Sequence, residues 1–186
     1  IDSSGVSRTT IRDQLLLGTA PADILTILDG VDPNFETHQY CIVDRSNDAA
    51  TYTGTSAQDF VYAGGATGKI GTTRYCVAGN VLTGQPVIDE AVLAIQNTGG
   101  SLSDKLMAAM EAARTMGGDG RCSCSVVDPT SCGSPPMTIS ITAVNGYVVS
   151  ARTGDTTACA QCGPGNYYLD LGVINNTTFP DPVLTL

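Results

Sequence analysis

Apolar residues recur at helical spacing in four segments of this chain. In each segment they fall three and four residues apart, which places them on one face of a helix, and Pro, Ser, Thr or Gly stands at the ends. The pattern therefore predicts helices over residues 9–17, 19–30, 86–96 and 101–117. Ser101, with Asp104 three residues later, has the spacing of a capping box that would fix the start of the last helix.

Short runs of β-branched and aromatic residues predict strands after each pair of helices. We expect strands over residues 39–43, 50–53 and 74–78, and in the last third over 122–127, 137–143, 147–151 and 167–174. Asn145-Gly146 is typical of a two-residue hairpin turn. Residues 54–72 are rich in Gly, Ala and Thr and predict a long loop. The order of helices, strands, helices and strands predicts an α+β fold with mainly antiparallel sheets.

No repeat or low-complexity linker divides the sequence, so we expect a single domain over residues 1–186. Residues 1–8 are short and polar enough to form an extended N-terminal arm. Residues 9–127 hold most of the predicted helices and form the central part. Residues 128–186 are expected to be rich in β-structure and stabilised by disulfides.

The excess of acidic over basic residues restricts the classes of molecule that this protein is expected to bind. Eighteen acidic and nine basic residues give a net charge of -9, which disfavours contact with nucleic acid and with anionic membranes. No apolar run is long enough to span a bilayer, so no membrane insertion is expected. We therefore expect neither a nucleic-acid partner nor a membrane-embedded segment.

Cysteine usage favours an oxidising compartment. The chain has seven cysteines, many for a cytosolic protein of this size, at Cys41, Cys76, Cys122, Cys124, Cys132, Cys159 and Cys162. Disulfides are the simplest interpretation, with the pairing open and one thiol left over. A zinc site is the alternative, because two of these cysteines have C-x-x-C spacing, but no second such pair exists. Overlapping glycosylation sequons at Asn175 and Asn176 also favour an extracellular, secreted protein.

Few other motifs indicate chemistry. The segment Gly64–Lys69 lacks the spacing and the hydroxyl residue of a phosphate-binding loop, and Gly118–Gly120 lacks the third glycine of a dinucleotide fingerprint, so no cofactor is expected. His38 is the single histidine and is interpreted as a surface or strand-edge residue. Asp32 is explained by helix ending and turn chemistry. Asp119 and Arg121 are close enough to orient each other or a substrate carboxylate, but their spacing alone favours a side chain that stabilises a turn and a solvated Arg.

Several segments follow one another in an order that resembles a known family. From about Thr10 to Val127 the chain resembles the bacterial and archaeal family called domain of unknown function 1028. The resemblance is carried by residues 17–24, Asp32, 40–44, 53–54, 77–80, Leu82, Val87, 106–112, 117–119, Arg121 and Ser125, with residues 168–173 and 180–182 similar to the closing strand and Asp-Pro ending of the family.

This resemblance implies an N-terminal-nucleophile (Ntn) hydrolase-like fold, a four-layer αββα sandwich. In such folds an N-terminal Thr, Ser or Cys attacks an amide with its own amine as base. Ile1 offers no such nucleophile, and we expect the N-terminal strands of the family to be missing from this chain. By position, Asn80, Asp119 and Arg121 would line the pocket region, with Asn80 as the oxyanion donor.

The leading hypothesis is a secreted structural or self-assembling protein on this fold, without catalysis by this chain. Strands from another chain or segment would complete its sheets, giving a homo-oligomer or polymer by strand complementation. The alternative is an Ntn-type amide hydrolase whose nucleophile lies on a missing N-terminal segment. A ligand-binding module that uses the region of Asn80 and Asp119 is a third hypothesis.

Overall fold

The computed structural model describes residues 4–46, 48–57, 61–123, 145–150, 167–173 and 181–186. The described elements are, in order, α1 (Val6–Leu16), α2 (Pro21–Val31), the 3-10 turn η1 (Phe35–Thr37), β1 (Gln39–Val43), β2 (Ala49–Thr53), β3 (Tyr62–Ile70), β4 (Thr73–Leu82), α3 (Pro86–Asn97), α4 (Leu102–Thr115), α5 (Gly120–Ser123), β5 (Gly146–Ser150), β6 (Leu169–Val173) and α6 (Pro182–Thr185). This mixture of helices and antiparallel strands confirms the α+β class.

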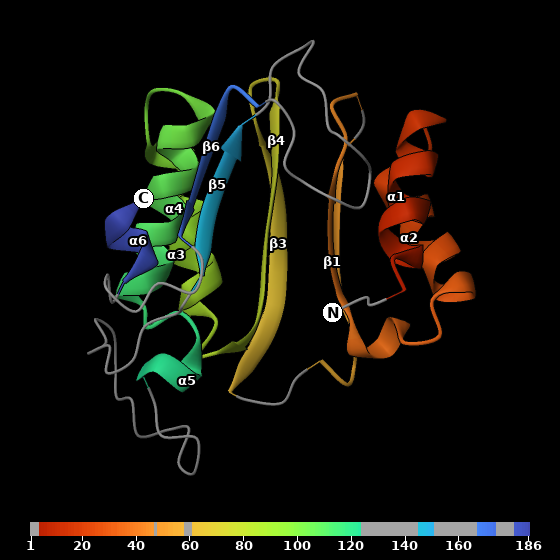
Figure 1. Ribbon diagram of the computed structural model, residues 1–186, viewed down its shortest axis with the longest axis horizontal. Coiled ribbons are helices and arrows are strands. Elements are labelled where there is room, and N and C mark those ends of the chain that lie inside the picture. The colour runs from red at the N-terminus through yellow and green to blue at the C-terminus, as the bar shows by residue number, and fades with distance from the viewer. Residues whose placement is uncertain (1–3, 47, 58–60, 124–144, 151–166, 174–180) are drawn as a thin grey trace.

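The described strands form three antiparallel pairs, the hairpins β1–β2 and β3–β4 and the pair β5–β6. Helices α1 and α2 lie on the outer side of β1–β2, and α3 and α4 lie beyond β3–β4 on the opposite side of the molecule (Figure 1). The first two hairpins face each other, with β1 against β4 and β2 against β3. The third pair, β5–β6, packs through β5 beside α4.

Two apolar cores hold the helices to the hairpins. On one side, Ile24 and Leu28 of α2 are fully buried against Tyr40 and Ile42 of β1. The alternate residues of β1 point to the other hairpin, because successive side chains of a strand face opposite sides. On the other side, Tyr75 of β4 packs against α3 and α4; the cluster there is Tyr75, Ala91, Ile95 and Ala109.

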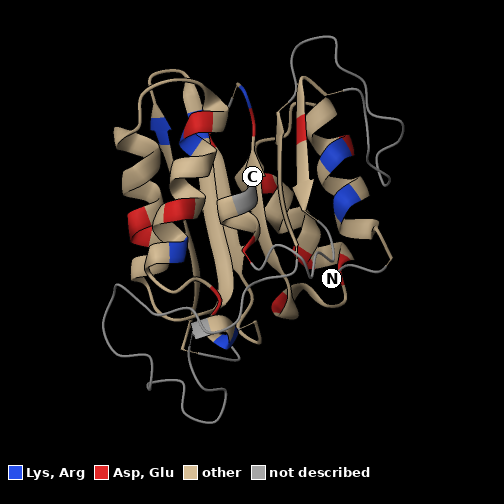
Figure 2. Cartoon of the chain, turned by 60° about the vertical axis from the view of Figure 1, so that its left-hand side comes forward, with Lys and Arg blue, Asp and Glu red and all other residues tan. Residues whose placement is uncertain are grey.

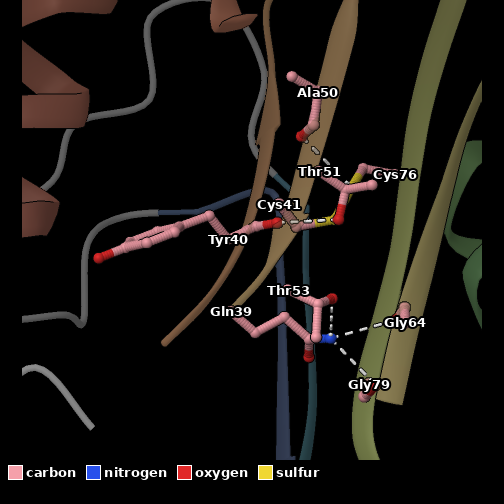
Figure 3. The surroundings of a disulfide bond; sticks show 9 residues. All are labelled: Gln39, Tyr40, Cys41, Ala50, Thr51, Thr53, Gly64, Cys76 and Gly79. Carbon is pink, nitrogen blue, oxygen red and sulfur yellow. Dashed lines mark hydrogen bonds between the residues drawn. A yellow bond between two sulfur atoms is a disulfide. The ribbon is translucent and has the colours of Figure 1, made fainter. Parts of the chain in front are cut away.

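Small residues allow the two central hairpins to approach closely. A Cβ atom added at Gly65 of β3 would lie 2.6 Å from the Thr51 hydroxyl of β2, so only glycine fits there. A disulfide joins Cys41 of β1 to Cys76 of β4, with 5.8 Å between their Cα atoms (Figure 3). The Gln39 amide donates to the carbonyls of Gly64 and Gly79 at 3.1 and 3.0 Å, which ties the start of β1 to the facing hairpin.

The structure corrects several sequence-based expectations. Strand β3 lies mainly in the second half of residues 54–72, which were expected to form a loop. Residues 120–123 form the short helix α5, so the strand expected from Cys122 does not begin there. Helix α1 begins at Val6 rather than after an arm of eight residues, and Ser7 is buried within it. Helix α2 continues through Gly30 to Val31.

Other expectations are confirmed or fall outside the described residues. The capping box of Ser101 and Asp104 is present at the start of α4. The strand expected over residues 137–143 lies outside the described ranges. None of the described helices has both the length and the apolar character that a membrane span requires.

Candidate functional site

An open pocket of about 490 Å³ lies between the first helix and the first hairpin, and we call it the α1–β1 pocket. Helix α1 contributes Ser7 and Arg8, the chain around the start of β1 contributes residues 37–41, and β4 contributes Asn80. Asn80 was singled out from the sequence, and its exposed side chain does line a pocket.

A buried carboxylate organises one wall of the pocket. Asp32, at the C-terminal end of α2, accepts hydrogen bonds at Oδ2 from the hydroxyls of Ser7 (3.0 Å) and Tyr40, and its Oδ2 lies 2.6 Å from Nδ1 of His38. Its other oxygen accepts the backbone N–H of Asn34 at 2.9 Å. Since an ionised carboxylate can only accept, Nδ1 of His38 carries the proton in this contact.

These contacts change the acidity of Asp32. Burial by itself would raise the pKa of Asp32, but the hydrogen bonds from Tyr40, His38, the Asn34 backbone and Ser7 outweigh it. They hold the pKa of Asp32 well below its usual value. Asp32 is therefore ionised at neutral pH and is a fixed negative charge beneath the pocket.

The lowered pKa of Asp32 predicts a loss of stability in acid. A group whose pKa is lower in the folded state stabilises the fold above its unfolded pKa, which for Asp is about 3.9. That contribution is lost as the pH falls from about 4 through the lower pKa of the folded state. We expect the difference in unfolding free energy between the wild-type protein and Asp32→Asn to shrink over this range. Urea denaturation at a series of pH values measures it, and a difference that stays constant from pH 6 to pH 2 would contradict the prediction.

His38 lies directly before β1, as the strand-edge interpretation expected, but the alternative of a surface residue is wrong. Only 15% of its side chain is exposed, and its imidazole is held by Asp32 and borders the α1–β1 pocket. The explanation of Asp32 by turn chemistry is incomplete, because one oxygen accepts the Asn34 N–H as expected while the other binds three side chains. Sequence reasoning missed this cluster, since its members lie on α1, α2 and β1.

Asp119 and Arg121 form their own pair beside Leu82, at the same C-terminal end of β4 as Asn80. The guanidinium Nε of Arg121 donates to both Asp119 oxygens, at 2.9 and 3.2 Å, so the two side chains orient each other. Asp119 also forms a bridge with Leu82 of β4. Burial raises the pKa of Asp119, but the hydrogen bonds and charge of Arg121 outweigh it and lower that pKa. Among the described residues, the lining of the α1–β1 pocket includes Asn80 but neither member of this pair.

A second hollow of about 490 Å³ is mainly apolar and lies between β4 and β5, with α3 and α4 beneath it. We call it the β4–β5 hollow. Its lining includes Val77 of β4, Ile95 of α3, Leu106 and Met110 of α4, and Val148 of β5. Cys41 lines both this hollow and the α1–β1 pocket, so the disulfide lies between them.

The remaining candidate residues are only partly described. Cys41 and Cys76 are joined, which confirms them as a disulfide, and Cys122 lies in α5. The other candidates lie outside the described residues: Cys124, Cys132, Cys159, Cys162, Asn175 and Asn176. Within the described ranges, no group of three or more His, Cys, Asp or Glu residues is arranged to hold a metal ion.

Comparison with known proteins identifies the family. The model of a family of unknown function, DUF1028, matches residues 6–127. The chain belongs to the DUF1028 family. Among solved structures, this DUF1028 chain is similar to the crystal structure of protein SPO2555 from Silicibacter pomeroyi, which the same family model describes. The TM-score is 0.50 and 24% of the residues are identical, over 57% of this chain and 46% of that one.

The DUF1028 chain thus spans about half the length of that relative. At this level of identity the likeness concerns the fold alone. A search among curated proteins found no match.

Proposed function

We propose that this DUF1028 protein is a secreted, non-catalytic assembly module on an Ntn-hydrolase-like sandwich. In this proposal a β-strand from a second copy of the chain completes the sheet at β4. The observation that carries the proposal is the β4–β5 hollow, an apolar space beside a strand edge that no described strand pairs.

The register of the second hairpin supports an open edge at β4. Ile70 and Thr73 flank a two-residue turn, and such a flanking pair is hydrogen-bonded. Bonded and non-bonded pairs alternate in an antiparallel ladder, so Tyr75 and Val77 also bond to β3. The backbone groups of Cys76 and Ala78 then point to the opposite side, where they are able to bond an incoming strand.

The walls of the hollow suit the side chains of such a strand. One face of the strand would lie over Leu106, Met110 and Ile95, and burial of each large aliphatic side chain there contributes roughly 1.5–3 kcal/mol. Association would also cover the unpaired edge of β4, which is a common site of pairing between chains. The disulfide between Cys41 and Cys76 supports a secreted protein, because such bonds persist in oxidising compartments.

Substitution in the hollow tests the proposal. Leu106→Glu puts a charge on the floor of the hollow and is expected to weaken self-association at least about tenfold, because a buried carboxylate lacks a partner there. Leu102→Glu is the matched control, since Leu102 lies on the same helix and is 51% exposed. Light scattering over a range of concentrations measures the effect. A monomeric wild-type protein, or equal effects of the two substitutions, would overturn the proposal.

The hydrolase hypothesis is favoured by one observation, the position of Asn80 on the open, polar α1–β1 pocket. In that case the nucleophile comes from another segment and Asn80 donates a hydrogen bond to the developing oxyanion. Two measurements distinguish the assembly module from the hydrolase. Amide hydrolysis that is lost in Asn80→Ala while Leu106→Glu leaves the oligomeric state unchanged would favour the hydrolase.

A further inference from the structure

The lining of the α1–β1 pocket carries basic side chains on a molecule that is acidic as a whole. Acidic residues are distributed over helices and loops on both sides of the hairpins (Figure 2), and the chain carries a net charge of -9. The pocket lining nevertheless contains Arg8 and His38 and no Asp or Glu. Asp32 lies beneath it, but its Oδ2 already accepts from Ser7, His38 and Tyr40. The lining therefore offers positive charge to a ligand.

Three polar groups of the lining are available to a ligand. Within the described part of the chain, the Arg8 guanidinium makes no hydrogen bond or ion pair, and the same holds for the Asn80 amide. With Nδ1 of His38 held by Asp32, Nε2 is the ring nitrogen that is able to bind a further group. A guanidinium prefers a carboxylate, and a primary amide matches the donor and acceptor of a peptide unit.

The edge of β1 adds a backbone surface to the same pocket. The Gly54 N–H donates to the His38 carbonyl at 3.0 Å, so residues 38, 40 and 42 bond towards β2. The N–H and C=O groups of Gln39 and Cys41 therefore point away from β2, and both residues line the pocket. Within the described residues β1 pairs with β2 alone, so this edge is able to bond an extended peptide.

We infer that the α1–β1 pocket binds the carboxyl-terminal residues of an extended peptide. The peptide backbone bonds the edge of β1 at Gln39 and Cys41, and the Asn80 amide bonds a peptide unit. The terminal carboxylate pairs with Arg8. Ile11 supplies an apolar wall for a small side chain. This site lies on the other side of the disulfide from the β4–β5 hollow, so it does not depend on the proposed assembly.

The single histidine gives the test a clean signal, because every imidazole resonance belongs to His38. N-acetyl-trialanine with a free carboxylate is titrated into the full chain, and binding is followed by the His38 resonances and by calorimetry. The same peptide with a carboxyl-terminal amide is titrated in the same way, and so is acetate alone. We expect saturable binding of the acid, at least about tenfold weaker binding of the amide, and no comparable binding of acetate.

A pair of arginine variants completes the test. Arg8→Gln is expected to weaken binding of the acid about tenfold, since the charge-assisted pair is lost. Arg12→Gln is the matched control, because Arg12 lies one turn further along α1, is paired with Asp13 and is outside the lining. Equal affinities for the acid and the amide, equal effects of the two variants, or no saturable binding at millimolar concentration would overturn the inference. Acetate that binds as tightly as the peptide would also overturn it, because a simple anion site would then suffice.

Discussion

Replacing Cys41 by serine is expected to lower the free energy of unfolding by about 3 kcal/mol. The disulfide joins residues 35 positions apart, so its loss restores much of the conformational freedom of the unfolded chain. It also links β1 to β4, two strands that otherwise meet through small side chains and the Gln39 amide. Denaturation in urea under oxidising conditions measures the change.

The partner cysteine provides an internal control for this prediction. Either substitution breaks the same bond, so Cys76→Ser and the double variant are expected to be as unstable as Cys41→Ser, rather than showing additive losses. Additive effects, or single variants as stable as the wild-type protein, would show that the bond does not stabilise the fold.

The helical half of this fold could be predicted from the sequence because packing and capping agree there. In α2 the residues Ile24 and Leu28 recur at the spacing of a helical face, and both are fully buried. In α4 the capping box fixes the first turn as expected. For these helices the local pattern and the tertiary contacts require the same conformation, so the pattern is sufficient.

The sequence pattern did not predict strand β3, because its glycines have a low preference for strands and are used instead for close packing. Glycine weakens an isolated strand, so the segment 62–70 has the composition of a loop. In the folded molecule the missing side chain at Gly65 admits the Thr51 hydroxyl from the facing hairpin. The need for close approach between two hairpins is a tertiary requirement, and no local pattern records it. The same holds for the pairing of Cys41 with Cys76 among seven cysteines.

The candidate site was only half predictable for a similar reason. The family-like segment around Asn80 pointed to the pocket, but Asp119 and Arg121 were grouped with it by motif alone and form a separate pair. Asp32 and His38 lie six residues apart across the η1 turn, and a polar residue at a buried position has no periodic signature. Only the turn at Phe35–Thr37 brings His38 back onto the carboxylate.

Asp32→Asn is expected to cost about 3 kcal/mol of unfolding free energy, comparable to loss of the disulfide. The Asp32 carboxylate receives the Ser7 and Tyr40 hydroxyls and the His38 imidazole on one oxygen and the Asn34 N–H on the other. An asparagine amide has one oxygen that accepts and an NH₂ group with two N–H donors. If the NH₂ group replaces Oδ1, it faces the Asn34 N–H, which is left without an acceptor. If it replaces Oδ2, the Ser7 and Tyr40 hydroxyls and the His38 imidazole lose their charged acceptor and must reorient to accept from it. Urea denaturation at neutral pH measures the loss.

Asp29→Asn separates this effect from a simple change of charge. Asp29 lies on the same helix, is exposed, and its substitution is expected to change stability by less than about 0.5 kcal/mol. The His38 resonances supply a second readout, because Asp32→Asn removes the negative partner of the imidazole while Asp29→Asn leaves it in place. Equal stabilities of the two variants, with unchanged His38 resonances in both, would mean that Asp32 does not hold α1, α2 and β1 together. Such a result would also mean that Asp32 does not fix the wall of the α1–β1 pocket.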